Sequence, residues 1–102
     1  MSLTLDCPLI GLETTFPETL YISKHKPTSK YACYSVDGVH GLACFSTQIA
    51  AAQFSSEIEG GMMEVVEVSF DEAREIAKER PMPVVSLMLL DDLNDPQIHY
   101  VR

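Results

Sequence analysis

The hydrophobic pattern is strongest in the segment Val84–Leu90, where Ser86 is the only polar residue. This segment shows no alternation of polar and apolar positions, which is typical of a strand that is buried on both faces. It is too short to span a bilayer, because a membrane-spanning helix needs about 20 apolar residues. We therefore predict that Val84–Leu90 is the central strand of a sheet, and that the remaining elements pair with it or cover it.

A second clear pattern is a β-hairpin around the dipeptide Asp37-Gly38. The flanking segments Tyr31–Val36 and Val39–Phe45 are strand-like, and Asp-Gly suits a two-residue type I′ turn because both turn residues need a positive φ. The resulting register predicts an apolar face on the core, formed by Ala32, Tyr34, Val36, Val39, Gly41, Ala43 and Phe45. The other face then carries Tyr31, Cys33, Ser35, His40, Leu42 and Cys44.

Two helices are predicted, each with a clear start. The first spans Thr47–Ser56, with Ser46 or the first residue of the helix as N-cap, because either hydroxyl can accept a hydrogen bond from a first-turn amide. The second spans Phe70–Arg80 and begins with a capping box, for which Ser69 and Glu72 have the required spacing. Its solvent-facing residues are predicted to be Asp71, Glu72, Arg74, Glu75, Lys78 and Glu79.

Three further strands complete the prediction. Leu20–Ile22 and Gln97–Val101 are short, the latter closing the sheet. Met62–Val68 suits the edge of a sheet, because Glu64 and Glu67 interrupt its apolar positions.

The element order is therefore β-(ββ)-α-β-α-β with a closing strand. This order predicts an α/β (α+β) fold, with one domain over residues 1–102 and a mixed sheet in which Val84–Leu90 is central. We expect both helices on one face of that sheet. The irregular apolar arm, residues 1–17, or a second subunit is expected to cover the other face.

The charge balance restricts the partners of the chain. Its 102 residues include 15 acidic and 7 basic side chains, for a net charge of −8. Such a chain is not expected to bind nucleic acid or an anionic membrane, because both depend on clustered lysine and arginine. Any charged partner should be basic. The amino terminus lacks the basic segment of a secretory signal, and the three cysteines show no CxxC spacing, so we expect a cytoplasmic protein with reduced thiols.

One candidate metal site lies on the predicted outer face of the hairpin. Cys33, His40 and Cys44 share that face, and two thiolates with an imidazole are suitable ligands for a soft metal ion. None of them has the close spacing of a zinc knuckle. The alternative is that the cysteines are small apolar groups and that the histidine is an ordinary surface residue.

Two polar segments are further candidates. The loop Lys24–Lys30 carries Lys24, Lys26 and Lys30, which could bind a phosphate or carboxylate, or could simply be solvated. The acidic segment Asp91–Asp95 follows the central strand and is either a cation site or an acidic turn, although it lacks the spacing of a calcium loop. The sequence contains no G-x-S-x-G, P-loop, dinucleotide or H-E-x-x-H signature, so no cofactor is expected and an enzyme is the less favoured interpretation.

One stretch of the chain resembles a known family. Asp37-Gly38, the strand Leu42-Ala43-Cys44-Phe45, the pair Ser46-Thr47 and the helical segment Gln48–Phe54 are similar to the hairpin-to-helix part of the SseB-type amino-terminal domain. The similarity extends over Leu20–Leu90. It implies a non-enzymatic accessory role in protein binding and names no site residue.

Two classes of function remain open. The first is a small acidic interaction or regulatory module that binds another protein or forms a homodimer. The second is a small-ligand or metal-binding protein or enzyme, which would use Cys33, His40 and Cys44 or the loop Lys24–Lys30.

Overall fold

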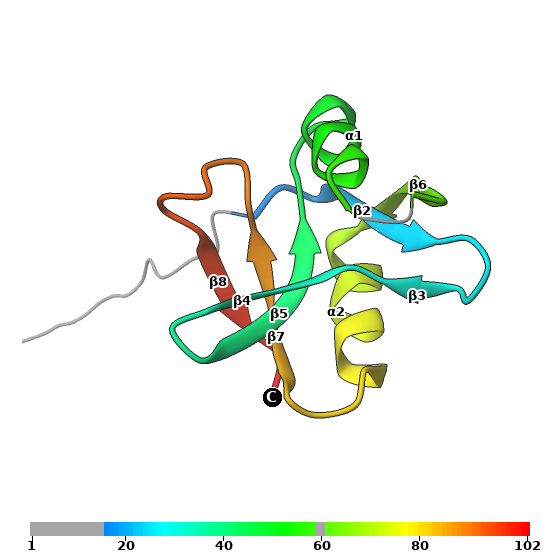
Figure 1. Ribbon diagram of the computed structural model, residues 1–102. Helices are drawn as coiled ribbons and strands as arrows, with labels where there is room; N and C mark the ends of the chain where they lie inside the picture. The colour runs from blue at the N-terminus through cyan, green and yellow to red at the C-terminus, as the bar shows by residue number, and fades with distance from the viewer. Residues whose placement is uncertain (1–15, 59–60) are drawn as a thin grey trace, which may run out of the picture.

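The computed structural model describes residues 16–58 and 61–102, which form seven strands and two helices in one mixed α+β body (Figure 1). Most of the predicted arm, residues 1–15, lies outside the described residues. The elements in chain order are β2 (Thr19–His25), β3 (Lys30–Tyr31), β4 (Cys33–Val36), β5 (Val39–Cys44), α1 (Gln48–Ser56), β6 (Met63–Ser69), α2 (Phe70–Glu79), β7 (Val84–Leu89) and β8 (Gln97–Tyr100).

The larger sheet has the strand order β4-β5-β7-β8, so that β7 lies between two neighbours. Strand β7 is parallel to β5 and antiparallel to β8, which makes the sheet mixed. Leu87 and Met88 point to opposite faces of β7, and both are fully buried. The predicted central strand is therefore confirmed, with its end at Leu89.

A second sheet of order β3-β2-β6 replaces the single sheet that the sequence predicted. The two sheets are joined where Tyr21 and Phe45 exchange backbone hydrogen bonds, each 2.9 Å long. Ala32 also links them, because its amide donates to Ser23 of β2 and its carbonyl accepts from Ala43 of β5. The predicted strand Tyr31–Val36 is consequently divided at Ala32 into β3 and β4.

Both predicted helix starts are confirmed. The Thr47 hydroxyl accepts from the Ala50 amide at 3.1 Å before α1. At α2 the Glu72 amide donates to the Ser69 hydroxyl at 3.0 Å, and the Ser69 amide donates to the Glu72 carboxylate at 2.8 Å. In the part of the chain that the structure describes, no helix is long and apolar enough to cross a membrane.

The prediction that both helices cover one face of a sheet is wrong. Successive residues of β2 point to opposite faces, and the two helices cover different ones. Leu20 and Ile22 lie in a core cluster with Ala73 of α2, whereas the Ser23 hydroxyl contacts the Ser55 hydroxyl of α1 at 2.7 Å. Figure 1 accordingly shows α1 at the top of the molecule and α2 on the other side of β2. Both faces of β2 are buried because each has its own helix.

The hairpin register is confirmed, and the predicted core face is buried at Gly41, Ala43 and Phe45, but the predicted outer face is buried in part as well. Tyr34 pairs with Gly41 and Val36 pairs with Val39, as expected. On the predicted outer face, however, Leu42 and Cys44 are fully buried in the same cluster as α2. On the predicted core face, Ala43 and Phe45 belong to a second buried cluster, against which the half-buried Tyr34, Val36 and Val39 pack. The helix α2 packs on the Leu42 side of β5 and α1 on the Ala43 side, so both faces of this strand contribute to the core.

Candidate functional site

The three predicted metal ligands differ in burial and do not form a metal-binding group in the described chain. The Cys44 thiol is fully buried and donates to the Leu42 carbonyl at 3.4 Å, and its burial raises its pKa to about 12. Such a thiol stays protonated, whereas a metal ligand must be a thiolate. Cys33 is exposed and His40 is half-buried. Within residues 16–58 and 61–102, no group of three or more His, Cys, Asp or Glu side chains is placed to hold a metal ion.

The basic loop spreads its three lysines apart in the fold. Lys24 lies within β2, where its neighbour across the β2–β6 pair is Glu64. Lys26 is exposed in the turn, and Lys30 is exposed at the start of β3. Lys30 lines a groove in the described chain together with apolar residues, and Lys24 and Lys26 do not line that groove, so the loop does not focus its charge on one point.

The groove beside Lys30 has a volume of about 480 Å³, and we call it the hairpin groove. Its apolar walls include Phe54, Ile58 and Met63, and Cys33 borders it. Burial raises the pKa of the Cys33 thiol, although the charge of Arg80 lowers it in part. The groove therefore joins parts of both predicted candidate sites, but its thiol is not activated as a nucleophile. The other residues that line it are His25, Thr28, Tyr31 and Ala32.

The acidic segment after β7 has a structural role. The Asp91 carboxylate accepts hydrogen bonds from both the amide and the hydroxyl of Ser46, the former at 2.9 Å. The Asp92 carboxylate accepts from the Asn94 amide at 2.9 Å. The Asp91 bonds connect the end of β7 to the residues that precede α1, and the Asp92 bond closes the turn itself. The carboxylates thus hold a turn, as one of the two sequence interpretations expected.

The most distinctive surface is a groove between β6 and α2, with a volume of about 550 Å³. We call it the α2–β6 groove. Its apolar residues are Tyr31, Val66, Val68 and Ile76. Its acidic residues are Glu67, Asp71, Glu72 and Glu75. An apolar floor bordered by carboxylates can hold a chain segment that carries both aliphatic and positively charged groups.

The local sequence explains why the acidic residues of α2 lie at this groove. Strand β6 ends at Ser69, which caps α2 directly, so the first turn of the helix lies beside the strand. Ala73 and Ala77 are fully buried and orient the helix. The acids Asp71 and Glu72 occupy the first turn, where negative charge is favoured by the helix dipole. The inward alanines thus turn the acids of α2 toward solvent and the groove.

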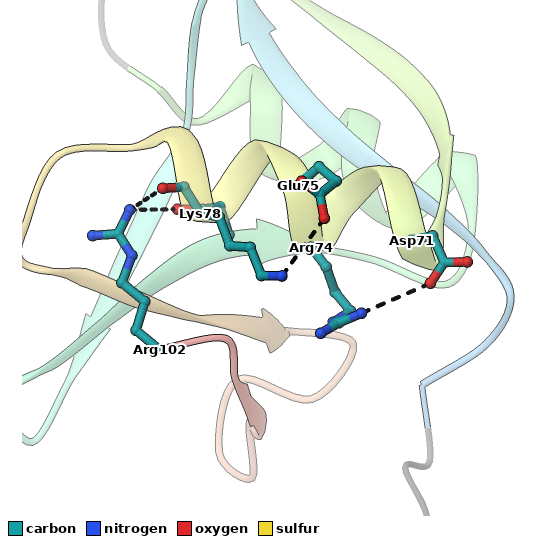
Figure 2. Close-up of polar contacts among 6 residues, drawn as sticks. Asp71, Arg74, Glu75, Lys78 and Arg102 are labelled. Carbon is teal, nitrogen blue, oxygen red and sulfur yellow. Dashed lines mark hydrogen bonds and ion pairs between the residues drawn. The ribbon is translucent and has the colours of Figure 1, made fainter.

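Two of these acids have cationic neighbours on the helix. Asp71 lies 4.0 Å from Arg74, and Glu75 lies 3.6 Å from Lys78, as Figure 2 shows. The Asp71 and Glu75 side chains are 90% and 66% exposed. Ion pairs so exposed contribute little and exchange readily with other partners. In the described chain, no salt bridge involves Glu72, so the groove keeps a negative balance.

A second, smaller groove lies on the opposite face of β6, against α1. It has a volume of about 340 Å³, and we call it the α1–β6 groove. The small side chains of α1 leave this space, since a buried serine and an alanine face the strand there. The residues that line it are Ala52, Ser55, Ser56, Gly61, Met62, Met63 and Val65. Strand β6 thus has a groove on each of its faces.

Sequence reasoning identified part of this site. The prediction of Met62–Val68 as an edge strand is confirmed by the strand order, in which β6 is terminal. The predicted exposure of Asp71, Glu72 and Glu75 is confirmed as well. Their convergence with Val66 on one groove was not predicted, because it depends on the angle at which the strand enters the helix. The feature of the sequence that could have indicated this groove is the series of acidic residues on both sides of the junction between the strand and the helix, from Glu67 to Glu75.

The resemblance of the segment Leu20–Leu90 to the SseB-type amino-terminal domain stays a prediction. The candidate site consists of two grooves, one on either face of the edge strand β6. No protein-family model matches the chain, and no curated protein matches it.

Proposed function

We propose that this protein is an interaction module that binds a positively charged segment of another protein in the α2–β6 groove. The observation that supports this proposal is the combination of an apolar floor with the carboxylates of Asp71, Glu72 and Glu75 in one open groove. Aliphatic contacts would provide affinity, and the carboxylates would select basic residues and accelerate the encounter. A net charge of −8 strengthens the same preference over the whole surface.

The chemistry of the other candidate sites also favours binding over catalysis. The two described cysteines are free, and burial raises the pKa of both thiols. A nucleophilic cysteine needs the opposite shift. Free thiols agree with a reducing compartment, so we place the module in the cytoplasm.

Peptide binding tests this proposal directly. The probe is a fluorescent peptide of alternating lysine and valine with seven residues, the length of β6. We expect saturable binding by fluorescence anisotropy, weakening as the salt concentration rises from about 0.05 M to about 0.5 M because screening reduces the attraction between charges. A peptide with glutamate in place of lysine should not bind.

Charge-neutral variants locate the binding site. Glu72→Gln combined with Glu75→Gln should weaken binding about threefold to tenfold, the range for two exposed charge contacts. The glutamine at position 72 can retain the capping box. The matched control is Glu57→Gln with Asp95→Asn, which removes the same charge from exposed positions outside the groove. Equal affinity of the two double variants would contradict the proposed site.

A second candidate function is the binding of a small amphipathic anion in the hairpin groove. The observation that favours it is the placement of Lys30 beside the apolar residues Phe54, Ile58 and Met63. A fatty-acid carboxylate would contact the lysine, with its chain along the apolar walls. Decanoate titrated into the parent protein should then give a saturable calorimetric binding signal. The variant Lys30→Glu should lose this signal. An unchanged calorimetric signal in that variant would reject this candidate.

A further inference from the structure

Strand β6 has one paired edge and one unpaired edge. In the order β3-β2-β6 it is terminal, and it pairs with β2 along all seven of its residues. Within the described chain, no strand pairs with its other edge. An unpaired edge of this length is a template for an additional strand.

The register shows which backbone groups point outward. Just before β6 the Met62 carbonyl accepts from the Lys26 amide at 2.9 Å, and just after it the Phe70 amide donates to the Glu18 carbonyl at 2.8 Å. In an antiparallel pair, every second residue bonds to the neighbouring strand. The even-numbered residues of β6 therefore bond to β2.

The odd-numbered residues direct their amide and carbonyl groups to the open edge. These residues are Met63, Val65 and Glu67, and the described chain supplies none of them with a backbone partner on that side. The next odd position, Ser69, is already occupied, because its amide donates to the Glu72 carboxylate. The capping box thus marks the end of the open edge.

The two grooves lie where the side chains of an added strand would point. A residue opposite Val65 would direct its side chain into the α1–β6 groove, and a residue opposite Val66 would direct it into the α2–β6 groove. The first groove is built of small and apolar residues. The second is bordered by Glu72 and Glu75. A strand that alternates apolar and basic residues matches both.

We propose that the partner segment binds as an additional strand along the open edge of β6, with apolar side chains in the α1–β6 groove and basic side chains in the α2–β6 groove. This inference rests on the proposed function and specifies how the segment is held. Backbone hydrogen bonds to Met63, Val65 and Glu67 provide affinity, and the alternation of side chains provides specificity.

A basic segment fits this edge better than a second copy of the chain. Pairing of β6 with another β6 would place the acids of both α2 helices beside the same pair of strands, where like charges oppose each other. The electrostatics of the edge therefore select a partner of opposite charge.

Amide hydrogen exchange by NMR tests the binding mode with the alternating lysine–valine peptide. The amides of Met63, Val65 and Glu67 should exchange rapidly in the free protein and become protected in the complex. The amides of Glu64, Val66 and Val68 should be protected in both states, because they bond to β2. A peptide of the same composition with its lysines and valines in two blocks should bind more weakly and protect none of the three outward amides.

A matched pair of variants isolates the backbone contact. Glu67→Gln removes only the charge, whereas Glu67→Pro removes the charge and the outward amide. Proline is tolerated at an edge position whose amide points away from the sheet. Glu67→Pro should bind about fivefold more weakly than Glu67→Gln, as the loss of one hydrogen bond predicts.

The outcomes separate this inference from the proposed function. Equal binding of the alternating and block peptides, without protection of the three outward amides, would overturn strand addition and leave the acidic groove as the binding site. Absence of binding by every basic peptide would overturn both. Protection of the outward amides with weaker binding by Glu67→Pro supports both.

Discussion

Gly41 of β5 and Ser86 of β7 are paired neighbours in the parallel part of the larger sheet, and they lie in close contact. A β carbon added at Gly41 would lie 2.5 Å from the Ser86 hydroxyl oxygen, 2.7 Å from Cγ of Met88 and 3.0 Å from the Ser86 carbonyl oxygen. The structure shows that this glycine makes room for β7.

Gly41→Ala should therefore destabilise the protein by about 1–3 kcal/mol, the usual cost of overpacking a core. Part of the clash is with backbone and cannot be relieved by rotation of a side chain. Urea unfolding measures the loss. The double variant Gly41→Ala with Ser86→Ala should recover part of it, and an unchanged midpoint in Gly41→Ala would contradict the packing.

The capping box of α2 should contribute measurably to stability. Ser69→Ala removes the hydroxyl that accepts from the Glu72 amide and should cost about 1 kcal/mol. Glu72→Gln is the matched variant, because glutamine can still accept from the Ser69 amide, and its cost should be smaller. Thermal unfolding followed by circular dichroism compares the two. A larger effect of Glu72→Gln would argue against the box.

The two described cysteines should differ in reactivity. Iodoacetamide at about pH 8 should modify Cys33 slowly, because it is exposed but its pKa is raised by burial of part of the side chain. It should not modify Cys44 in the folded protein, where the pKa is about 12 and the thiol is inaccessible. Peptide mapping by mass spectrometry distinguishes the sites. Labelling of Cys44 before unfolding would show that this part of the core opens.

Stability should fall on mild acidification because of His99. Its ring packs against Phe16 and Phe70, with centroids 6.0 and 5.1 Å away. Desolvation, followed by the charge of Arg74, lowers its pKa in the folded protein below the ordinary value of 6.5. The unfolded chain therefore binds more protons as the pH falls through 6.5, and folding loses stability below that value.

The variant His99→Phe tests this contribution, because it keeps a ring but cannot bind a proton. Urea unfolding between about pH 7.5 and pH 5.5 avoids the titration of most carboxylates. The loss of stability over this range should be smaller in His99→Phe than in the parent protein. Equal losses would assign the acid sensitivity to other groups.

The larger sheet also supports a prediction of self-association. On its face away from α2, Tyr34, Val36, Val39 and Ile98 are half-buried and form an apolar surface. We predict that two copies pair through this surface in an isologous dimer. Light scattering at micromolar concentration decides the question: a mass near 11.3 kDa that does not rise with concentration rules the dimer out. If a dimer forms, Val36→Lys should shift it to monomer.

The sequence alone determined the local structure of this protein. The central strand, the Asp37-Gly38 hairpin and both helix starts were predicted correctly. Each depends on interactions between residues close in the chain, such as a turn that needs positive φ or a hydroxyl that caps an amide. These preferences are the same wherever the segment lies in the fold.

Only the tertiary structure decided how these elements cover one another. A strand pattern shows that β2 has two faces, but not that α1 covers Ser23 while α2 covers Leu20 and Ile22. For the same reason, the burial of Leu42 and Cys44 on the second face of the hairpin was not predicted. The grooves on both sides of β6 arise from the positions of the two helices around an edge strand. These positions are set by packing between distant segments. A pattern of polar and apolar residues shows that a face must be covered, but not which segment covers it.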